Sequence, residues 1–286
     1  MKILITGGTG FLGCRLARFL GLSHEVVALG SRQLDITDRE EVLHCFMEQS
    51  PRVVIHLAAI ADTQYCEQNP DDSLLINVQG TKHVAEAAAA VGAKLIFASS
   101  EQVYNGQEDG MPNVEQQYLQ PRSVYARHKL EAERIVAEVL PTSVSLRLTW
   151  MYDLPSSPLP QRSGLLINLI AAAREGRVLK ASTRERRGIT HVWDVVRRIE
   201  AAFALPGGAY NFGSTTEVST FDTYLAAART LKEAGLLDVE AEQLVEADES
   251  WTRNLAIDLG RLQQFGISFP STLTGLQQAV FHHRKS

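Results

Sequence analysis

Tyr125 and Lys129 stand four positions apart in the run Tyr-Ala-Arg-His-Lys, and this pair of residue types could perform acid–base chemistry. Within a helix, residues at this spacing project from one face. A tyrosine with a pKa of about 10 transfers protons poorly near neutral pH, but a neighbouring ammonium favours the phenolate and lowers that pKa. Ser100 is a third candidate, because it follows a predicted strand and its hydroxyl could hydrogen-bond a substrate oxygen. Taken alone, the Tyr/Lys spacing is also common on helix surfaces.

The N-terminal run predicts a site for a dinucleotide. An apolar strand over 2–6 leads into Gly7, Gly10 and Gly13, and a helix over 11–20 follows. In this arrangement the first glycine permits a tight turn, the second lets the backbone approach the phosphates, and the third lets the helix pack closely. The helix N-terminus adds free N–H groups and the positive end of the dipole. A glycine-rich turn without a ligand is the alternative.

The end of the second predicted strand, over 25–29, bears on which nicotinamide cofactor is preferred. An acidic residue at this point takes the ribose hydroxyls of NAD, but here the residues are Ser31 and Arg32. A hydroxyl and a guanidinium suit the 2′-phosphate of NADP(H), which leaves NAD(H) as the second choice. The alternative for Arg32 is a solvated loop residue. Asp35 and Ile36 could flank the adenine.

The remaining elements alternate in a way that predicts a Rossmann-type α/β fold with a doubly wound parallel sheet. The predicted strands lie over 52–57, 94–99 and 144–149, and the helices over 39–49, capped by Asp38, 72–91 and 123–140, with 105–122 as a loop. These elements assign residues 1–153 to a nucleotide-binding domain. His56, at the end of a strand, is expected to be a satisfied core histidine.

After residue 153 the pattern changes to a smaller, mixed α/β region, 154–286, suited to holding a substrate. Its first part, 154–164, is rich in proline and serine and predicts a mobile connection. The predicted elements are helices over 165–175, 194–205 with Asp194 as the cap, and 220–234, and strands over 188–193 and 209–212. The segment 188–212 is expected to return to the first domain.

Composition excludes several classes of function. The 286 residues are 45% hydrophobic and 21% charged, and the net charge of −5 favours neither nucleic acid nor an anionic membrane. The apolar runs are too short to span a bilayer, and the N-terminus enters a strand without a signal peptide, so a cytoplasmic protein is expected. Cys14, Cys45 and Cys66 follow no metal-ligand spacing and are expected to be unpaired, inert thiols, so no metal is predicted.

Several motifs together resemble one family, the extended short-chain dehydrogenase/reductases. The resemblance covers nearly the whole chain and rests on Gly-Gly-Thr-Gly-Phe-Leu-Gly at 7–13, His-Leu-Ala-Ala at 56–59, Asn77, Ser99-Ser100 and Tyr125-x-x-x-Lys129. Within it, the chain looks most like the dTDP-4-dehydrorhamnose reductase group, through Leu-Asp-Ile-Thr-Asp at 34–38, Leu-Arg-Leu-Thr-Trp-Met-Tyr at 146–152 and Arg253-Asn254.

The resemblance implies roles for particular residues. The catalytic residues would be Ser100, Tyr125 and Lys129. The cofactor contacts would be Gly7, Thr9, Gly10, Phe11, Leu12, Gly13, Ser31, Arg32, Asp35, Ile36, Leu57, Ala58, Ala59, Asn77, Ser99, Tyr125 and Lys129. The substrate contacts would be Ser100, Glu101, Trp150 and Arg253, although Trp150 could equally be a core aromatic residue.

The implied activity is NADPH-dependent reduction of a nucleotide-linked 4-keto-6-deoxy sugar. Dehydratases of the superfamily carry an acidic pair where this chain has Glu101-Gln102, and an amide cannot act as the acid or base that water elimination needs. Two alternatives remain: a sugar-nucleotide epimerase, and a non-catalytic NADP-binding regulatory subunit similar to the β subunit of methionine adenosyltransferase. Family members often pair through the helices corresponding to 72–91 and 123–140, so a homodimer is also expected.

Overall fold

The structure, a computed structural model, describes residues 1–107, 110–155 and 157–282. The chain divides into two compact units. The first unit comprises Met1–Asn105, Tyr118–Leu148 and Val196–Asn211, and the second comprises Gly106–Gln117, Thr149–Val195 and Phe212–Ser286. The chain passes into the second unit at Thr149, close to the expected boundary at 153. The segment that returns to the first unit is shorter than the expected 188–212, and a piece of the long loop belongs to the second unit.

The first unit is built on a six-stranded sheet. Its elements are β1 (Lys2–Thr6), α1 (Phe11–Leu20), β2 (Glu25–Leu29), α2 (Arg39–Gln49), β3 (Val53–His56), α3 (Thr63–Gln68), α4 (Pro70–Leu74), the π-helical turn η1 (Leu75–Gly80), α5 (Thr81–Ala90), β4 (Lys94–Ser100), the 3₁₀ turn η2 (Glu101–Tyr104), α6 (Val124–Val139), β5 (Val144–Leu148), the 3₁₀ turn η3 (Glu200–Ala204) and β10 (Gly208–Phe212).

The strand order, β2-β1-β3-β4-β5-β10, confirms the predicted Rossmann-type sheet. The ladders from β2 through β5 are parallel. The chain winds from β1 to β2 on one side and then continues from β3 on the other, so the direction of winding reverses between β1 and β3. Because Thr6 is in register with His56, these two strands end together. Ligands of open parallel sheets bind at such a switch point.

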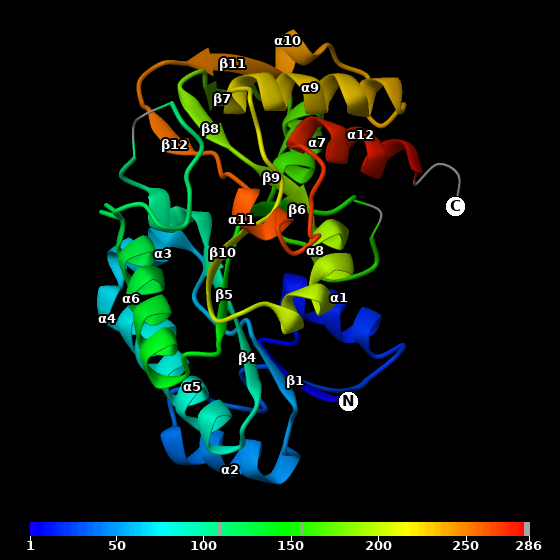
Figure 1. Ribbon diagram of the computed structural model, residues 1–286. Helices are drawn as coiled ribbons and strands as arrows, with labels where there is room; N and C mark the ends of the chain where they lie inside the picture. Colours follow the sequence, from blue (N-terminus) through cyan, green and yellow to red (C-terminus); the bar gives the residue numbers. More distant parts are fainter. Residues whose placement is uncertain (108–109, 156, 283–286) are drawn as a thin grey trace. The chain divides into compact units, whose positions relative to one another are not determined.

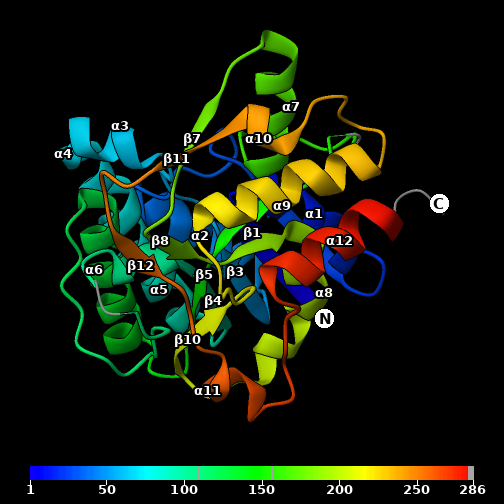
Figure 2. The ribbon, with the colours of Figure 1, turned by 90° about the horizontal axis from the view of Figure 1, so that it is seen from above.

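Helices cover both faces of this sheet. Figures 1 and 2 place α5 and α6 on one side of the strands and α1 on the other. The apolar core under α2, α5 and α6 includes Phe46, Phe97 and Val136. The alanine-rich stretch of α5 is part of this core, because Ala85 and Ala88 are fully buried within the chain. Close internal packing therefore accounts for those two alanines without a second subunit.

Local signals predicted many of the elements, with two corrections. The carboxylate of Asp38 accepts hydrogen bonds from the backbone of residues 40 and 41, so it caps α2 as predicted. The predicted helix over 72–91 instead begins at Pro70 and is interrupted by the π-helical turn η1. Asp194 does not cap a helix: it lies in the first turn of α8 (Val192–Arg198), because the strand before it, β9 (Ile189–His191), is shorter than expected.

The second unit is a mixed α/β region. Besides β9 and α8, which extends into the first unit, its elements are β6 (Trp150–Tyr152), α7 (Leu165–Glu175), β7 (Leu179–Ser182), β8 (Glu185–Arg187), α9 (Thr220–Glu233), α10 (Ala241–Leu244), β11 (Val245–Asp248), β12 (Arg253–Leu255), α11 (Gly260–Gln263) and α12 (Thr272–His282). Its strands form parallel pairs: β6 with β9, β7 with β11, and β8 with β12.

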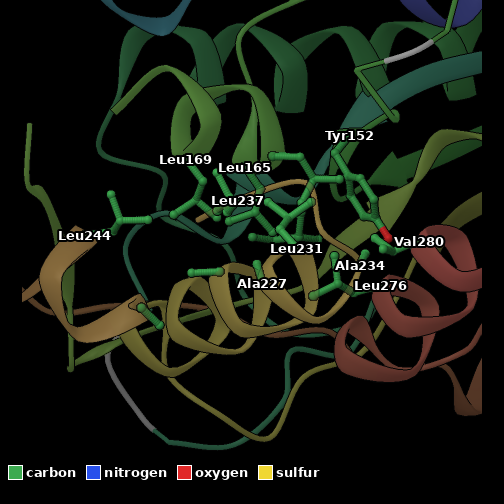
Figure 3. Packing of buried hydrophobic residues seen from close by; sticks show 14 of the residues in the cluster. Tyr152, Leu165, Leu169, Ala227, Leu231, Ala234, Leu237, Leu244, Leu276 and Val280 are labelled. Carbon is green, nitrogen blue, oxygen red and sulfur yellow. The ribbon is translucent and has the colours of Figure 1, made fainter. Parts of the chain in front are cut away.

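The core of the second unit lies between its helices. Figure 3 shows Leu165 and Leu169 of α7 meeting Leu231 of α9, with Leu276 and Val280 of α12 beside them. Within α7 and within α12 the two named residues are four positions apart, which is close to the period of a helix with one apolar face. The predicted helices over 165–175 and 220–234 are therefore confirmed to within a residue.

Candidate active site

The glycine turn after β1 lies against the turn after β3. Gly7 has a φ of +68°, which L side chains rarely adopt, and its carbonyl oxygen accepts from the Gly10 N–H at 3.0 Å. A Cβ atom on Gly7 would lie 2.7 Å from the backbone nitrogen of Ala58, and one on Gly13 would lie 2.3 Å from the Gly7 carbonyl oxygen. The two turns and the start of α1 are packed too closely for side chains at these positions.

The N-terminus of α1 suits an anion. Its N-cap, Gly10, makes no side-chain hydrogen bond to the first turn, and that turn carries no acidic residue. The free N–H groups and the positive dipole end therefore meet neither a capping side chain nor a carboxylate. Thr9 and Gly10 are exposed, whereas Leu12 is buried in the core, so a nucleotide contact from Leu12 would use its backbone.

Beyond β2 the predicted phosphate and adenine contacts differ in exposure. Ser31 and Arg32 are both exposed, as a site for a 2′-phosphate requires. The carboxylate of Asp35 accepts from both the backbone and the hydroxyl of Thr37, and these bonds lower the pKa of Asp35. Ile36 is buried, and a Cβ on residue 80 would lie 2.7 Å from its Cδ1 atom. Its side chain packs into the protein, which leaves the predicted adenine contact to the neighbouring backbone.

Asn77 holds the turn after β3 in place. Its side-chain oxygen accepts from the Ile60 N–H at 2.8 Å, and its amide group donates to the Ile60 carbonyl oxygen at 3.0 Å and to Ser73 Oγ at 3.1 Å. The side chain is fully buried in the wide turn η1. Asn77 therefore positions the turn that contains Leu57, Ala58 and Ala59, all half-buried, and its predicted contact with the cofactor stays a prediction.

His56 is the satisfied core histidine that the sequence indicated. Its Nδ1 lies 2.6 Å from Thr6 Oγ1 and its Nε2 lies 3.0 Å from Thr81 Oγ1. The ring stacks on Phe97 at 5.7 Å between centroids. Burial, helped by the nearby ammonium of Lys129, lowers the pKa of His56 to about 3. The imidazole is therefore neutral at physiological pH, with one ring nitrogen as donor and the other as acceptor, and it does not act as an imidazolium acid.

The helix α6 carries Tyr125 and Lys129 on a buried face. Its N-cap, Ser123, accepts from the Ala126 N–H at 3.3 Å, so Tyr125 falls in the first turn. Tyr125 is 7% exposed and Lys129 is 3% exposed, which excludes a pair on a solvated helix surface. Lys129 Nζ donates to the Ala98 carbonyl oxygen at 2.8 Å, and burial lowers the pKa of Lys129 to about 8.

The two adjacent serines at the end of β4, Ser99 and Ser100, differ in burial and in their hydrogen-bond partners. Ser99 is buried and donates its hydroxyl to Glu133 on α6, so its predicted contact with the cofactor would have to use the backbone. Ser100 is half-buried and caps η2, with its hydroxyl oxygen accepting from the Gln102 N–H at 3.2 Å. That hydroxyl keeps its proton to donate, as the predicted bond to a substrate oxygen requires. Glu101, the predicted substrate contact, is buried beside Gln102.

The predicted substrate residues Trp150 and Arg253 both belong to the second unit. Arg253 donates to the buried carboxylate of Glu185 through Nε at 2.7 Å, and its guanidinium lies over the ring of Trp251. The guanidinium of Arg187 lies 4.9 Å from the ring centroid of Trp150. Sequence reasoning missed Glu185 and Arg187, although their alternate spacing on a short strand puts both on one face.

Two further expectations concern metals and membranes. Among the residues described, no group of three or more His, Cys, Asp or Glu side chains is placed to hold a metal ion. The three cysteines are free, and burial raises the pKa of Cys45 and of Cys66, which suits the predicted inert thiols. No helix in the described part of the chain has the length and apolarity needed to cross a membrane.

Known proteins share both the sequence pattern and the fold. A dTDP-4-dehydrorhamnose reductase of Aggregatibacter actinomycetemcomitans is 26% identical over 282 residues, covering 93% of this chain and 94% of the relative. A methionine adenosyltransferase 2 subunit beta of Bos taurus is 27% identical over 93% of this chain and 83% of its own. The crystal structure of a Bacillus anthracis dTDP-4-dehydrorhamnose reductase in complex with NADP matches with a TM-score of 0.86 at 22% identity, covering 98% and 99% of the two chains.

The family described as the RmlD substrate binding domain matches residues 1–256. This span contains the glycine turn, the helix with Tyr125 and Lys129, and Trp150 and Arg253 of the second unit. The chain therefore belongs to the RmlD substrate binding domain family.

Proposed function

We propose that this protein is an NADPH-dependent reductase of a nucleotide-linked 4-keto-6-deoxy sugar. The observation that carries the proposal is the buried face of α6, where Tyr125 is followed one turn later by an ammonium bonded to the strand that ends in Ser100. A buried lysine is costly to maintain, so its presence beside a tyrosine favours chemistry over structure. Family membership and the reductases among the relatives support the same reaction.

The residues present fit a bound NADP(H). The uncapped N-terminus of α1 suits the pyrophosphate, and the close approach of Gly7 to Ala58 keeps side chains out of that place. Ser31 and Arg32 would take the 2′-phosphate, because both are exposed and a guanidinium binds phosphate through paired donors. The reductase from Bacillus anthracis was solved with NADP, which supports this preference. NAD(H) would lack the contact to Arg32.

In the proposed reaction the cofactor, when bound, supplies a hydride for the carbonyl carbon. The phenol of Tyr125 gives its proton to the carbonyl oxygen, which becomes the new hydroxyl. The hydroxyl of Ser100 donates a hydrogen bond to the same oxygen and polarises it. The ammonium of Lys129 stabilises the phenolate left on Tyr125. An ammonium has three donors, so the bond to Ala98 leaves two for Tyr125 and for the ribose.

Trp150 and Arg253 remain the proposed substrate contacts. Arg253 would pair with a phosphate of the sugar nucleotide, and Trp150 would stack on an uncharged ring. The buried carboxylate of Glu185 fixes the guanidinium of Arg253, which reduces the rotamer entropy lost on binding.

The test is a set of nucleotide-linked 4-keto sugars offered with NADPH, followed by absorbance at the nicotinamide band. The proposal predicts stoichiometric oxidation of NADPH with one nucleotide-linked keto sugar and formation of the corresponding alcohol. An epimerase would convert one sugar nucleotide into another without net loss of NADPH.

The second candidate, a regulatory subunit, is favoured by the likeness to methionine adenosyltransferase 2 subunit beta. It predicts tight NADPH binding without oxidation by any sugar nucleotide in the set.

A homodimer through α5 and α6 also remains a proposal. Light scattering at micromolar concentration would return a particle of twice 31.5 kDa if it is correct, and of 31.5 kDa if it is wrong.

A further inference from the structure

Glu133 extends the buried face of α6 by one more turn beyond Lys129. Tyr125, Lys129 and Glu133 follow each other at four-residue spacing, and all three side chains are buried. The carboxylate is close enough to oppose the effect of burial on the pKa of Lys129. Nothing in the proposed proton transfer uses this glutamate directly.

A network of polar side chains surrounds the Glu133 carboxylate. Two nitrogens of Arg147 on β5 donate to it, Nε at 3.0 Å and Nη2 at 2.7 Å, and Ser99 of β4 donates its hydroxyl. The other terminal nitrogen of Arg147 donates to Tyr104 Oη at 2.9 Å, and that hydroxyl donates to Asn211 Oδ1 at 2.7 Å. The network therefore joins α6 to β4, β5, η2 and β10 within the first unit.

Stability alone is a weak explanation for this network. Removing two opposite charges from water costs as much as their attraction returns, and well-packed apolar residues often replace a buried ion pair without loss. The ion pair of Glu133 and Arg147 is almost completely buried, with side-chain exposures of 7% and 5%. Its location next to the proposed catalytic groups suggests a second role.

We propose that Glu133 is a positioning residue for the reaction: through Ser99 it fixes the end of β4 that presents Ser100, and its negative charge keeps Lys129 protonated. The inference rests on the proposed function. Ser99 and Ser100 are consecutive, so a hydrogen bond that anchors the first limits the movement of the second. The same carboxylate faces Lys129 from one helical turn away, which makes one residue responsible for both geometry and charge.

The charged and titratable groups around Lys129 define what the loss of Glu133 would do. The thiol of Cys66 on α3 interacts electrostatically with Lys129, whose Nζ lies 4.7 Å from the centroid of the Phe97 ring. The neutral imidazole of His56 stacks on the same ring. Tyr125 is on the same helix, and Arg147 donates both to Glu133 and to Tyr104. Without the carboxylate, Lys129 would lose a nearby negative charge, and the positive charge of Arg147 would remain uncompensated. Both the ammonium and the phenol would then lose protons more easily.

The test is the pH profile of kcat/KM for Glu133→Gln, with Glu131→Gln as the matched control. Glu131 is on the same helix but exposed, so its substitution should leave the profile unchanged. We expect the alkaline limit, the pH above which kcat/KM declines, to fall by about one pH unit in Glu133→Gln. Loss of an adjacent opposite charge lowers the pKa of a cationic group by about that amount or more. We also expect a lower kcat, since Ser99 loses a charged partner. Glu133→Asp, which keeps the carboxylate, should retain the wild-type alkaline limit.

A second variant separates positioning from folding. Glu133→Gln leaves Arg147 buried and unpaired, and such a change can unfold a protein. The double variant Glu133→Met/Arg147→Met removes both charges and should fold. Its alkaline limit should still lie below that of the wild type, by less than in Glu133→Gln. An unchanged limit in both variants would overturn the proposal.

One measurement is independent of the sugar substrate. The titration of the Lys129 side chain, followed by NMR on selectively labelled protein, should move to lower pH in Glu133→Gln. If none of the nucleotide-linked keto sugars leads the wild-type protein to oxidise NADPH, the proposed function is wrong. If the titration of Lys129 does not move in Glu133→Gln, the proposed role of Glu133 is wrong.

Discussion

The ammonium of Lys129 donates a 2.8 Å hydrogen bond to the carbonyl oxygen of Ala98. Ala98 precedes the two serines at the end of β4. This bond therefore joins α6, which carries Tyr125 and Lys129, directly to the strand that presents Ser100. Both partners lie within the first unit. The bond satisfies one donor of the ammonium, but burial of the charge away from water still costs stability, and this cost can be measured separately from activity.

Tyr125→Phe tests the proton donor. The substitution keeps the ring and its packing and removes the hydroxyl. We expect turnover to fall by a factor of about 10²–10⁴, the usual contribution of a positioned acid–base group, with NADPH affinity and melting temperature nearly unchanged. Tyr118→Phe is the control, because Tyr118 is exposed and belongs to no proposed contact. A Tyr125→Phe protein with undiminished turnover would rule out the mechanism.

Lys129→Met tests the cost of the buried ammonium. The pKa of Lys129 is lowered from 10.5 to about 8, so between these pH values the unfolded chain binds the additional proton and wild-type stability rises with pH. Below pH 8 the wild type carries the full penalty for the buried charge, roughly 3 kcal/mol. Lys129→Met removes this penalty but also loses the bond to Ala98, which offsets part of the gain. We expect lower turnover but equal or greater stability at pH 7, by urea denaturation. If the difference in unfolding free energy does not shift in favour of the wild type between pH 7 and 10, this account fails.

Arg32→Ala tests the cofactor preference. If Arg32 binds the 2′-phosphate, the substitution should weaken NADPH binding by roughly 1.5–3 kcal/mol, the value of a hydrogen bond to a charged group, and leave NADH binding nearly unchanged. Titration calorimetry with both nucleotides measures this, and Arg18→Ala, an exposed arginine in the last turn of α1, serves as the control. Equal losses for the two cofactors would mean that Arg32 does not contact the phosphate.

His56 predicts sensitivity to acid. Its pKa is about 3 in the folded protein and about 6.5 when unfolded, so between these values the unfolded chain binds more protons and stability falls as pH falls. The loss across this window is on the order of 5 kcal/mol. We expect His56→Gln to be less stable at pH 7, because its bonds to Thr6 and Thr81 are disturbed, but to show a shallower decline towards pH 4. His44→Gln, at an exposed position, should keep the wild-type slope.

The sequence by itself determined the features that depend on local pattern. The spacing of Gly7, Gly10 and Gly13 between an apolar run and a helix defines the turn, because a tight turn and close packing tolerate no Cβ atoms there. The four-residue spacing of Tyr125 and Lys129 places both on one face of α6 for the same kind of reason, the period of the helix. The alternation of strands and helices predicted the parallel sheet.

Tertiary structure decided which polar side chains are committed to partners elsewhere in the chain. The side chain of Asn77 is engaged with Ile60 and that of Ser99 with Glu133, so both side chains hold the backbone of the site, and their predicted cofactor contacts stay predictions. Arg253 finds Glu185 at a distance of 68 residues, through a parallel pairing of two short strands. Periodicity reports the face on which a side chain lies, but partners far apart in sequence are chosen when the whole fold packs. The ion pair of Glu133 and Arg147 beneath the proposed catalytic residues was therefore visible only in three dimensions.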